Sequence, residues 1–330
     1  TLTATQILQH PGYDVDSNND LAIVWLSGTA PVMADRYDIY RDSDEIGQAF
    51  TFSGYGRTGT GSTGATSSDT ATPIRLKASN QFDADAATLK SYLGSGMAWT
   101  PLSGTQLIAD FDNGTSTNDV LGQLIYRYDT GRGLDEGLIA SGDSGGPAFL
   151  QNKLAGVASY TASLTRGSIN PDIDSSTNSS FGEIAAWQRV SAYQQWIDQS
   201  LRANYPNAPS IPNEVKKEVA EGNSGISFAY FLLQFTGVRS DPNQILSVDY
   251  ATRDGSALGG TDYLAVSGTL NLYPNENQAV IPVEIIGDST PEPSEYFYLD
   301  VFNPVGGSFG EGVVKLTAVR TILDDDGWFA

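Results

Sequence analysis

Cysteine is absent from this chain of 330 residues, and histidine occurs only once, at position 10. Without cysteine the protein has no disulfide bond, no thiolate nucleophile and no cysteine-ligated zinc. No apolar run approaches the roughly 18 residues that a membrane-spanning helix needs, and no basic-then-apolar leader opens the chain. We therefore expect a soluble protein with no membrane span, from which any leader has been removed.

Basic residues are also scarce. Lys and Arg number 18 against 39 Asp and Glu, which gives a formal net charge of -21. Such a charge repels phosphate backbones and anionic membrane surfaces, so nucleic acid is not an expected partner. The surplus of carboxylates suits high-salt surroundings or bound divalent cations, although a merely solvated acidic surface explains it equally well.

Helical patterns are few, because Gly and Pro account for 35 and 15 residues and other turn-forming residues are abundant. Short apolar runs bounded by Gly, Asn and Pro predict a mostly β chain. The strongest helical periodicity covers 190–201, and the proline-rich stretch ANYPNAPSIPNE soon follows it. We predict a first domain over 1–202, a linker over 203–214 and a second domain over 215–330.

The clearest chemical motif is SGDSGGP, which begins at Ser141 and runs straight into a short apolar strand. Its glycines allow the backbone to fold tightly around Ser144, so that the hydroxyl is exposed beside two inward-aimed amides. Asp143 directly precedes the nucleophile, where it can meet a buried amine and lock the turn. The GDSGGP string resembles the nucleophile motif of the chymotrypsin and trypsin family of serine proteases.

This resemblance implies that Ser144 is the nucleophile and that the amides of Gly142 and Ser144 form the oxyanion hole, which Asp143 shapes. Upstream, HPGYDVDSNNDLAIVWL resembles the segment in which that family carries its catalytic acid, which implies that Asp20 orients an imidazole. Alone, Asp20 would be an ordinary turn residue before a strand. Its place ahead of the GDSGGP motif, and the SGYGRTGTGSTG stretch at 53–64 that resembles the family's SGWG turn, favour the catalytic interpretation.

The expected catalytic histidine is missing from this sequence. His10 is next to Pro11 and shortly before Asp20, whereas the family's histidine comes far earlier, so we expect His10 to be a non-catalytic surface residue. The chain is then expected to begin after a cleavage or truncation and to be inactive alone, because a serine hydroxyl without a base is a weak nucleophile. We predict that its own cleaved N-terminal fragment stays bound and supplies the histidine.

Substrate preference follows only from alignment to the same family. The alignment puts Leu138 at the base of the primary pocket, which implies an apolar or aromatic residue before the scissile bond in a protein or peptide substrate. A shift of one residue would bring in Gly137 or Ile139, and the alternative is that Leu138 is a core residue. The resemblance also implies that Ser159, Tyr160 and Thr161 form the strand that holds the substrate.

The last third of the chain alternates apolar and polar residues in short strands, which predicts a β-sandwich. Its segments VDYATRDGSALGGTDYLAVSGTL, IPVEIIGDSTPEPSEYFYLDVFNP and TILDDDG resemble the Calx-β domain. The resemblance implies a calcium cofactor, because calcium takes six to eight oxygen ligands. The implied ligands are Glu221, Asp262, Asp288, Glu292, Glu295, Asp324, Asp325 and Asp326. Gly287 replaces a frequent second Asp, so one ion site is expected to be weakened, and a solvated acidic rim remains the alternative.

Together these features predict an all-β chain: an incomplete double β-barrel of trypsin-like type followed by an Ig-like β-sandwich. The expected function is a secreted, bacterial serine endopeptidase with a calcium-binding Calx-β domain. Secretion follows from the two resemblances and not from cysteine usage, whereas a bacterial origin is expected because animal relatives usually carry disulfides. The alternative is a catalytically inactive protease-like protein that serves calcium-dependent adhesion or binding.

Overall fold

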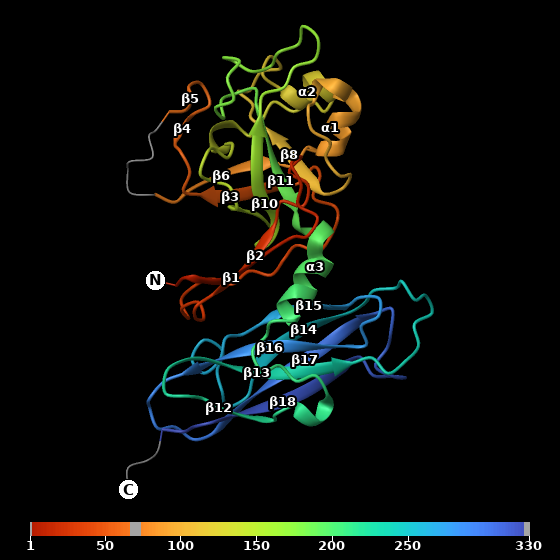
Figure 1. Cartoon of the computed structure of the whole chain (residues 1–330). Helices are drawn as coiled ribbons and strands as arrows, with labels where there is room; N and C mark the ends of the chain where they lie inside the picture. The colour runs from red at the N-terminus through yellow and green to blue at the C-terminus, as the bar shows by residue number, and fades with distance from the viewer. Residues whose placement is uncertain (1, 67–73, 327–330) are drawn as a thin grey trace. The chain divides into compact units, whose positions relative to one another are not determined.

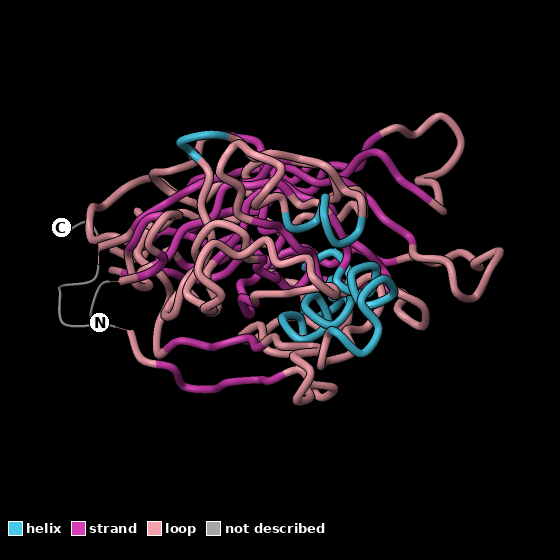
Figure 2. The backbone as a smooth tube through the Cα atoms, turned by 90° about the horizontal axis from the view of Figure 1, so that it is seen from above, coloured by secondary structure: helices cyan, strands magenta, loops and turns pink. Residues whose placement is uncertain are grey.

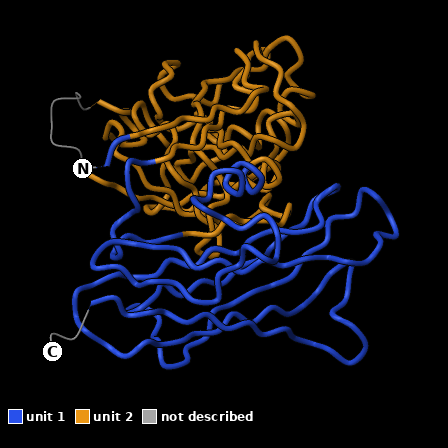
Figure 3. Tube along the Cα trace, turned by 60° about the horizontal axis from the view of Figure 1, so that its bottom comes forward, with its two compact units in different colours: residues 1–3, 26–36, 197–330 blue, residues 4–25, 37–196 orange. Residues whose placement is uncertain are grey.

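The computed structural model describes residues 2–66 and 74–326, and the chain forms two compact units. One unit contains residues 1–3, 26–36 and 197–330, and the other contains residues 4–25 and 37–196; Figure 3 colours them blue and orange. Strands dominate the secondary structure (Figure 2), so the predicted all-β class is confirmed. The division between the units falls inside a helix, and the linker proposed at 203–214 stays a prediction.

The unit coloured orange in Figure 3 is built on a seven-stranded sheet, whose strands Figure 1 labels. This sheet contains the strands before and after Ser144 in the chain. Alternation in AFTFSG sends Phe50 and Phe52 into the core, where Phe50 stacks on Phe82 at 3.9 Å and meets the buried Trp187 edge-on at 4.9 Å between ring centroids. The sheet order is β6-β3-β9-β10-β11-β8-β7, with β3 Ala49–Gly54, β6 Leu76–Gln81, β7 Ala84–Asp85, β8 Gln106–Asp110, β9 Pro147–Leu150, β10 Lys153–Ala162 and β11 Ile184–Arg189.

Two short helices and a second apolar cluster cover one side of this unit. Asp85 caps α1 (Ala86–Leu93) by accepting the Ala87 amide, and Asp119 caps α2 (Val120–Ile125) by accepting the Gly122 amide. Such caps satisfy amides that a helix N-terminus leaves without partners. Single turns of 3-10 helix occur at η1 Gly94–Gly96 and η2 Gly133–Asp135, and a small hairpin forms at β4 Gly59–Thr60 and β5 Gly64–Ala65.

A separate two-stranded sheet, β1 (Ala4–Gln9) and β2 (Ala22–Leu26), precedes the seven-stranded sheet in the chain. Several of its apolar side chains are exposed, with Ile7 at 66% and Val24 at 47%. Natural sheets seldom leave apolar edges uncovered, because such edges pair with other chains.

The helix predicted over 190–201 is confirmed as α3 (Val190–Arg202). It is the longest helix among residues 2–66 and 74–326, and none of the helices in that part of the chain is long and apolar enough to cross a membrane.

The blue unit contains the predicted β-sandwich. A five-stranded sheet in the order β12-β18-β17-β14-β15 faces the antiparallel pair β13-β16, and β12 runs parallel to β18. The elements are η3 Pro212–Glu214, β12 Glu218–Ala220, β13 Gly225–Gln234, β14 Leu246–Asp254, β15 Ser267–Leu272, β16 Gln278–Gly287, β17 Glu295–Val305 and β18 Lys315–Leu323.

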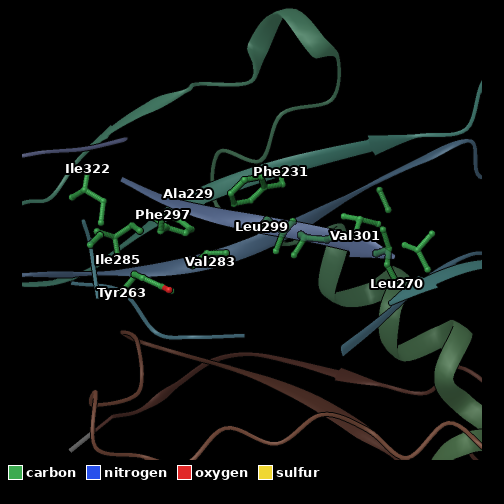
Figure 4. Close-up of a cluster of buried hydrophobic side chains, with 14 of the residues drawn as sticks. Ala229, Phe231, Tyr263, Leu270, Val283, Ile285, Phe297, Leu299, Val301 and Ile322 are labelled. Carbon is green, nitrogen blue, oxygen red and sulfur yellow. The ribbon is translucent and has the colours of Figure 1, made fainter. Parts of the chain in front are cut away.

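The sandwich core is made of side chains that alternate along these strands (Figure 4). Phe297 of β17 is fully buried, and its ring stacks on Tyr263 at 4.4 Å and meets Phe231 edge-on at 5.9 Å. Phe297 therefore joins strand β13, strand β17 and the segment that leads into β15.

Replacing Phe297 by Ala is expected to destabilise the sandwich by about 3–5 kcal/mol, because the change removes apolar contacts and leaves a cavity. Hydrogen exchange of amides in β13 to β18, followed by mass spectrometry, measures this loss for the sandwich itself. The matched control is Val319→Ala, since Val319 is 44% exposed. Equal protection in the two variants would show that Phe297 is not central to the core.

Candidate active site

The turn around Ser144 has the form that its glycines predict. Gly142 has a φ of +97°, a conformation that side-chain-bearing residues seldom adopt, and Ser144 itself is exposed. The Gly145 amide donates to the Ala158 carbonyl at 2.8 Å, and the Gly146 amide donates to the Asp143 carbonyl at 2.8 Å. Among the described residues, the amides of Gly142 and Ser144 have no hydrogen-bond acceptor, so both are free to meet an incoming oxyanion.

The Asp143 carboxylate fixes this turn from below. One oxygen accepts the Gly56 amide at 2.7 Å, and the other accepts the Ala140 amide at 2.9 Å. The approach is close: a Cβ on Gly54 would lie 1.9 Å from the carboxylate. Asp143 thus holds the nucleophile turn against the SGYG stretch, and both of its oxygens are satisfied by backbone groups of this chain.

The nucleophile turn and Asp20 contact neighbouring residues in the middle of β10. Ala158 pairs with the nucleophile turn, and the next residue, Ser159, donates its hydroxyl to the Asp20 carboxylate at 2.7 Å. The register between β10 and β11 shifts between Ala158 and Tyr160, which is a bulge at Ser159. Bulges re-aim a side chain, and this one directs Ser159 toward Asp20.

His10 lies elsewhere in the same unit. Its ring packs edge-on against Trp196 at 4.9 Å and Tyr193 at 5.4 Å, and its Nδ1 accepts the Gly12 amide at 3.1 Å. Partial burial lowers the pKa of His10, which favours the neutral ring. None of these contacts involves the carboxylate of Asp20 or the hydroxyl of Ser144, in keeping with a non-catalytic residue.

Leu138 is half-buried and packs against the aromatic core of the seven-stranded sheet. It also lines a cavity of about 480 Å³ beside Asp143 and Gly56. These contacts are those of the core alternative, and a role for Leu138 at the base of a substrate pocket remains a prediction.

Tyr160 and Thr161 follow Ser159 on β10, where they pair with Ala186 and Ala185 of β11. The Tyr160 hydroxyl donates to the Gln106 side chain at 2.8 Å and accepts from the Trp99 indole at 2.9 Å. Burial raises the pKa of Tyr160 to about 12. Its hydroxyl is therefore committed to contacts within the unit, and a role of Ser159, Tyr160 and Thr161 in holding a substrate stays a prediction.

The carboxylates implied as calcium ligands gather at one end of the sandwich, where β12, β16 and β18 end and β17 begins. One oxygen each from Asp262, Glu292 and Glu295 lies within 4.8 Å of the others. Burial, together with Asp262, raises the pKa of Glu295 to about 7, and burial with the neighbouring acids raises that of Glu221 to about 6.

The remaining acids lie at the same end of the sandwich, and two of them accept hydrogen bonds from a backbone amide or a side chain. Asp325 accepts the Gly222 amide at 2.8 Å, Asp326 accepts from the Asn223 side chain, and the Asp288 amide donates to Glu221. Buried oxygens of Asp324 and Asp326 have no hydrogen-bond partner. A group of hard oxygen donors, some without partners, fits calcium.

Comparison with known proteins agrees with this architecture. The unit is rich in strands, and its exposed serine lies beside two free amides in a turn that the preceding aspartate holds. This is the arrangement of a trypsin-like serine protease domain. A family model described as Trypsin matches residues 1–197, and the chain belongs to that family. A second model, described as Calx-beta domain, matches residues 233–326.

Individual relatives cover only parts of the chain. The human sodium/calcium exchanger 2 is 38% identical over 108 residues, which are 29% of this chain and 12% of the exchanger's length. A solved structure of the calcium binding domain CBD12 of CALX1.1 is 33% identical over 33% of this chain and 42% of its own, with a TM-score of 0.27. Mouse neuropsin, a serine protease, is 14% identical over 61% of this chain and 71% of its own, with a TM-score of 0.41.

Gln188 is a supporting residue that the sequence analysis did not identify. It is fully buried, and its amide donates to the Ser159 hydroxyl at 3.3 Å and to the Ser17 carbonyl at 2.8 Å, while its oxygen accepts the Tyr193 hydroxyl at 3.3 Å. The available signal was a polar residue directly after the apolar run IAAW, because buried polar groups need partners.

Gly54→Ala is expected to lower the stability of the nucleophile turn by about 1–3 kcal/mol, since the new methyl group would displace the Asp143 carboxylate. Hydrogen exchange of the peptide over 140–146 reports the change. Gly96→Ala is the matched control, because the nearest atom to a Cβ there is 3.8 Å away. If the two variants exchange alike, Asp143 does not depend on the space at Gly54.

Proposed function

We propose that this chain is the nucleophile-bearing part of a secreted, bacterial serine endopeptidase whose sandwich binds calcium. The observation that carries the proposal is the exposed Ser144 beside two free amides, in a turn held by Asp143. Secretion rests on the resemblances of the two domains. Bacterial origin rests on the absence of cysteine, because animal relatives of the protease usually carry disulfides.

In the proposed reaction, the Ser144 hydroxyl attacks the carbonyl carbon of the scissile peptide bond and gives its proton to a histidine. The amides of Gly142 and Ser144 hold the negative oxygen of the tetrahedral intermediate. The histidine then protonates the leaving amine as the peptide C–N bond breaks, and water later releases the acyl group from Ser144 by the same route. Asp20 orients the imidazole, and Ser159 and Gln188 keep Asp20 in place.

The histidine in this proposal comes from a segment outside the given sequence, which associates with the β1–β2 sheet. The exposed apolar side chains of that sheet, such as Ile7 and Val24, support this docking, because covering them removes apolar surface from water. The loop that connects β1 to β2 contains both His10 and Asp20. This sheet therefore lies close in sequence to the catalytic acid, and a segment docked on it would approach that residue.

The predicted preference for an apolar or aromatic residue before the scissile bond belongs to the same proposal. Its support is the apolar side chain of Leu138, which lines the cavity beside Asp143. Calcium at the sandwich would be held by the carboxylates of Asp262, Glu292 and Glu295, with Glu221 and Asp324 beside them. Bound there, the ion would neutralise the clustered negative charge and stabilise the folded sandwich.

Active-site labelling tests the proteolytic part of the proposal. Protein from its natural source, treated with a fluorophosphonate, is expected to carry one adduct on Ser144 and to contain a histidine-bearing companion peptide in its intact-mass spectrum. The chain without that peptide should react at least about 10⁴-fold more slowly, because removal of one triad member costs about that much or more.

Ser144→Ala should abolish the adduct, whereas Ser141→Ala, a change of the exposed serine in the same turn, should keep it. Natural material with no companion peptide and no adduct would favour the alternative, an inactive protease-like protein used for calcium-dependent binding.

Metal removal tests the calcium part. Calcium at about 100 times its dissociation constant should stabilise the sandwich by about 2.7 kcal/mol, because the ion binds only the folded form. The triple variant Asp262→Asn, Glu292→Gln, Glu295→Gln should lose this gain, as measured by hydrogen exchange in β12 to β18 with and without a chelator. Glu311→Gln, which removes an exposed acid from the same unit, is the control. A gain retained by the triple variant would contradict the assignment.

A further inference from the structure

A cluster of buried carboxylates lies in the unit that contains Ser144, among residues that the proposed reaction does not use. Asp110, Asp112 and Asp119 are only 3%, 6% and 1% exposed. One carboxylate oxygen from each lies within 4.8 Å of the other two. Acidic side chains are seldom buried so completely without a partner of opposite charge.

Backbone amides fix all three residues in place. Asp110 ends strand β8 and accepts the Leu121 amide at 2.8 Å, and Asp119 caps α2 by accepting the Gly122 amide at 2.6 Å. Asp112 is held through its own amide, which donates to Glu136 at 2.8 Å. The three carboxylates therefore converge from one strand end, one loop and one helix cap.

Asp112 supplies an independent sign of a missing partner. Its Oδ1 is buried and has no hydrogen-bond partner. The charges that act on Asp112 most strongly belong to four further carboxylates, Glu136, Asp119, Asp129 and Asp83. Within residues 2–66 and 74–326, no Lys or Arg forms an ion pair with any of Asp110, Asp112 and Asp119. An unpaired buried carboxylate is costly, so this oxygen needs a cation or a proton.

We propose that Asp110, Asp112 and Asp119 bind one calcium ion in the protease unit, at a site distinct from the sandwich. The donors are all hard carboxylate oxygens, with neither histidine nor cysteine among them, and such a set suits calcium or magnesium. Magnesium demands near-ideal octahedral geometry and keeps several waters, whereas calcium accepts irregular sets of carboxylates and carbonyls. The burial of this site favours calcium. The inference does not depend on proteolytic activity.

The site is linked through Glu136 to the segment of the chain that precedes Ser144. Glu136, which holds the Asp112 amide, is followed by Gly137, whose amide donates to the Ser79 carbonyl of β6 at 3.1 Å. The chain then continues directly to the turn around Ser144. A bound ion would therefore fasten the end of β8, the start of α2 and the segment that enters the nucleophile turn.

Calcium stoichiometry tests the proposal on the full chain. In a background that disables the sandwich (Asp262→Asn, Glu292→Gln, Glu295→Gln, Asp324→Asn), equilibrium dialysis with metal analysis should still find one calcium per chain. Adding Asp112→Asn should weaken that binding by at least about tenfold, since even changes beside a metal's ligands cost that much. Asp135→Asn, which removes an exposed acid from η2, should leave it unchanged.

Thermal unfolding separates a metal site from a merely protonated cluster. Calcium should raise the Tm of the background variant. Asp112→Asn should raise the calcium-free Tm, because like charges are removed, and abolish the calcium-induced rise. Asp119→Asn offers a second test that preserves the helix cap, since Asn caps as well as Asp. A folded background variant that binds no calcium at millimolar concentrations, or one whose binding survives both changes, would overturn the proposal.

Discussion

The two hydrogen bonds from Gly56 and Ala140 to the Asp143 carboxylate are the constraint on which the catalytic geometry depends. They pull the residue before Ser144 beneath the turn, and the turn can then present the serine hydroxyl and two free amides on its outer side. Glycine is needed at 54 and 56 because a Cβ there would occupy the place of the carboxylate, and at 142 because its φ of +97° disfavours any side chain. Strand β10 completes the arrangement, since it pairs with the turn at Ala158 and with Asp20 at Ser159.

The acidic residues of the chain are distributed unevenly between the exposed surface and two partly buried clusters. Many acids are at the surface, where water screens them. Others collect at one end of the sandwich and around the end of β8. Burial and neighbouring acids raise the pKa values of Glu221 and Glu295 in the first group and of Asp110, Asp112 and Asp119 in the second. The two proposed calcium sites would offset this repulsion, which the few lysines and arginines among the described residues do not do at these clusters.

Local motifs allowed much of this structure to be predicted from the sequence. The GDSGGP string gave the turn around Ser144 because its glycines act within a few residues, and periodicity gave α3 and the sandwich strands. The hydrogen-bond partner of Asp20 could not be predicted from the sequence, because a bulge far along the chain brings Ser159 to it. Leu138 was placed by alignment alone, which cannot distinguish a pocket from the aromatic core beside it.

The cluster at Asp110 was also missed, although the spacing of DFDNGTSTND was visible. A run of acids and turn residues ordinarily indicates a solvated loop. Glu136 and Asp83 reach these acids from other segments of the chain, and such long-range contacts leave no local pattern in the sequence.

The hydrogen bond between the Asp112 amide and Glu136 closes the loop over 112–136 at its base. This closure has an evolutionary consequence. The tip of that loop, around Tyr126 and Tyr128, is exposed. Once the ends are joined, doubling the length between them costs only about 0.6 kcal/mol of closure entropy. Insertions at this tip can therefore accumulate and diversify the surface there, while the hydrogen-bonded base of the loop keeps its geometry.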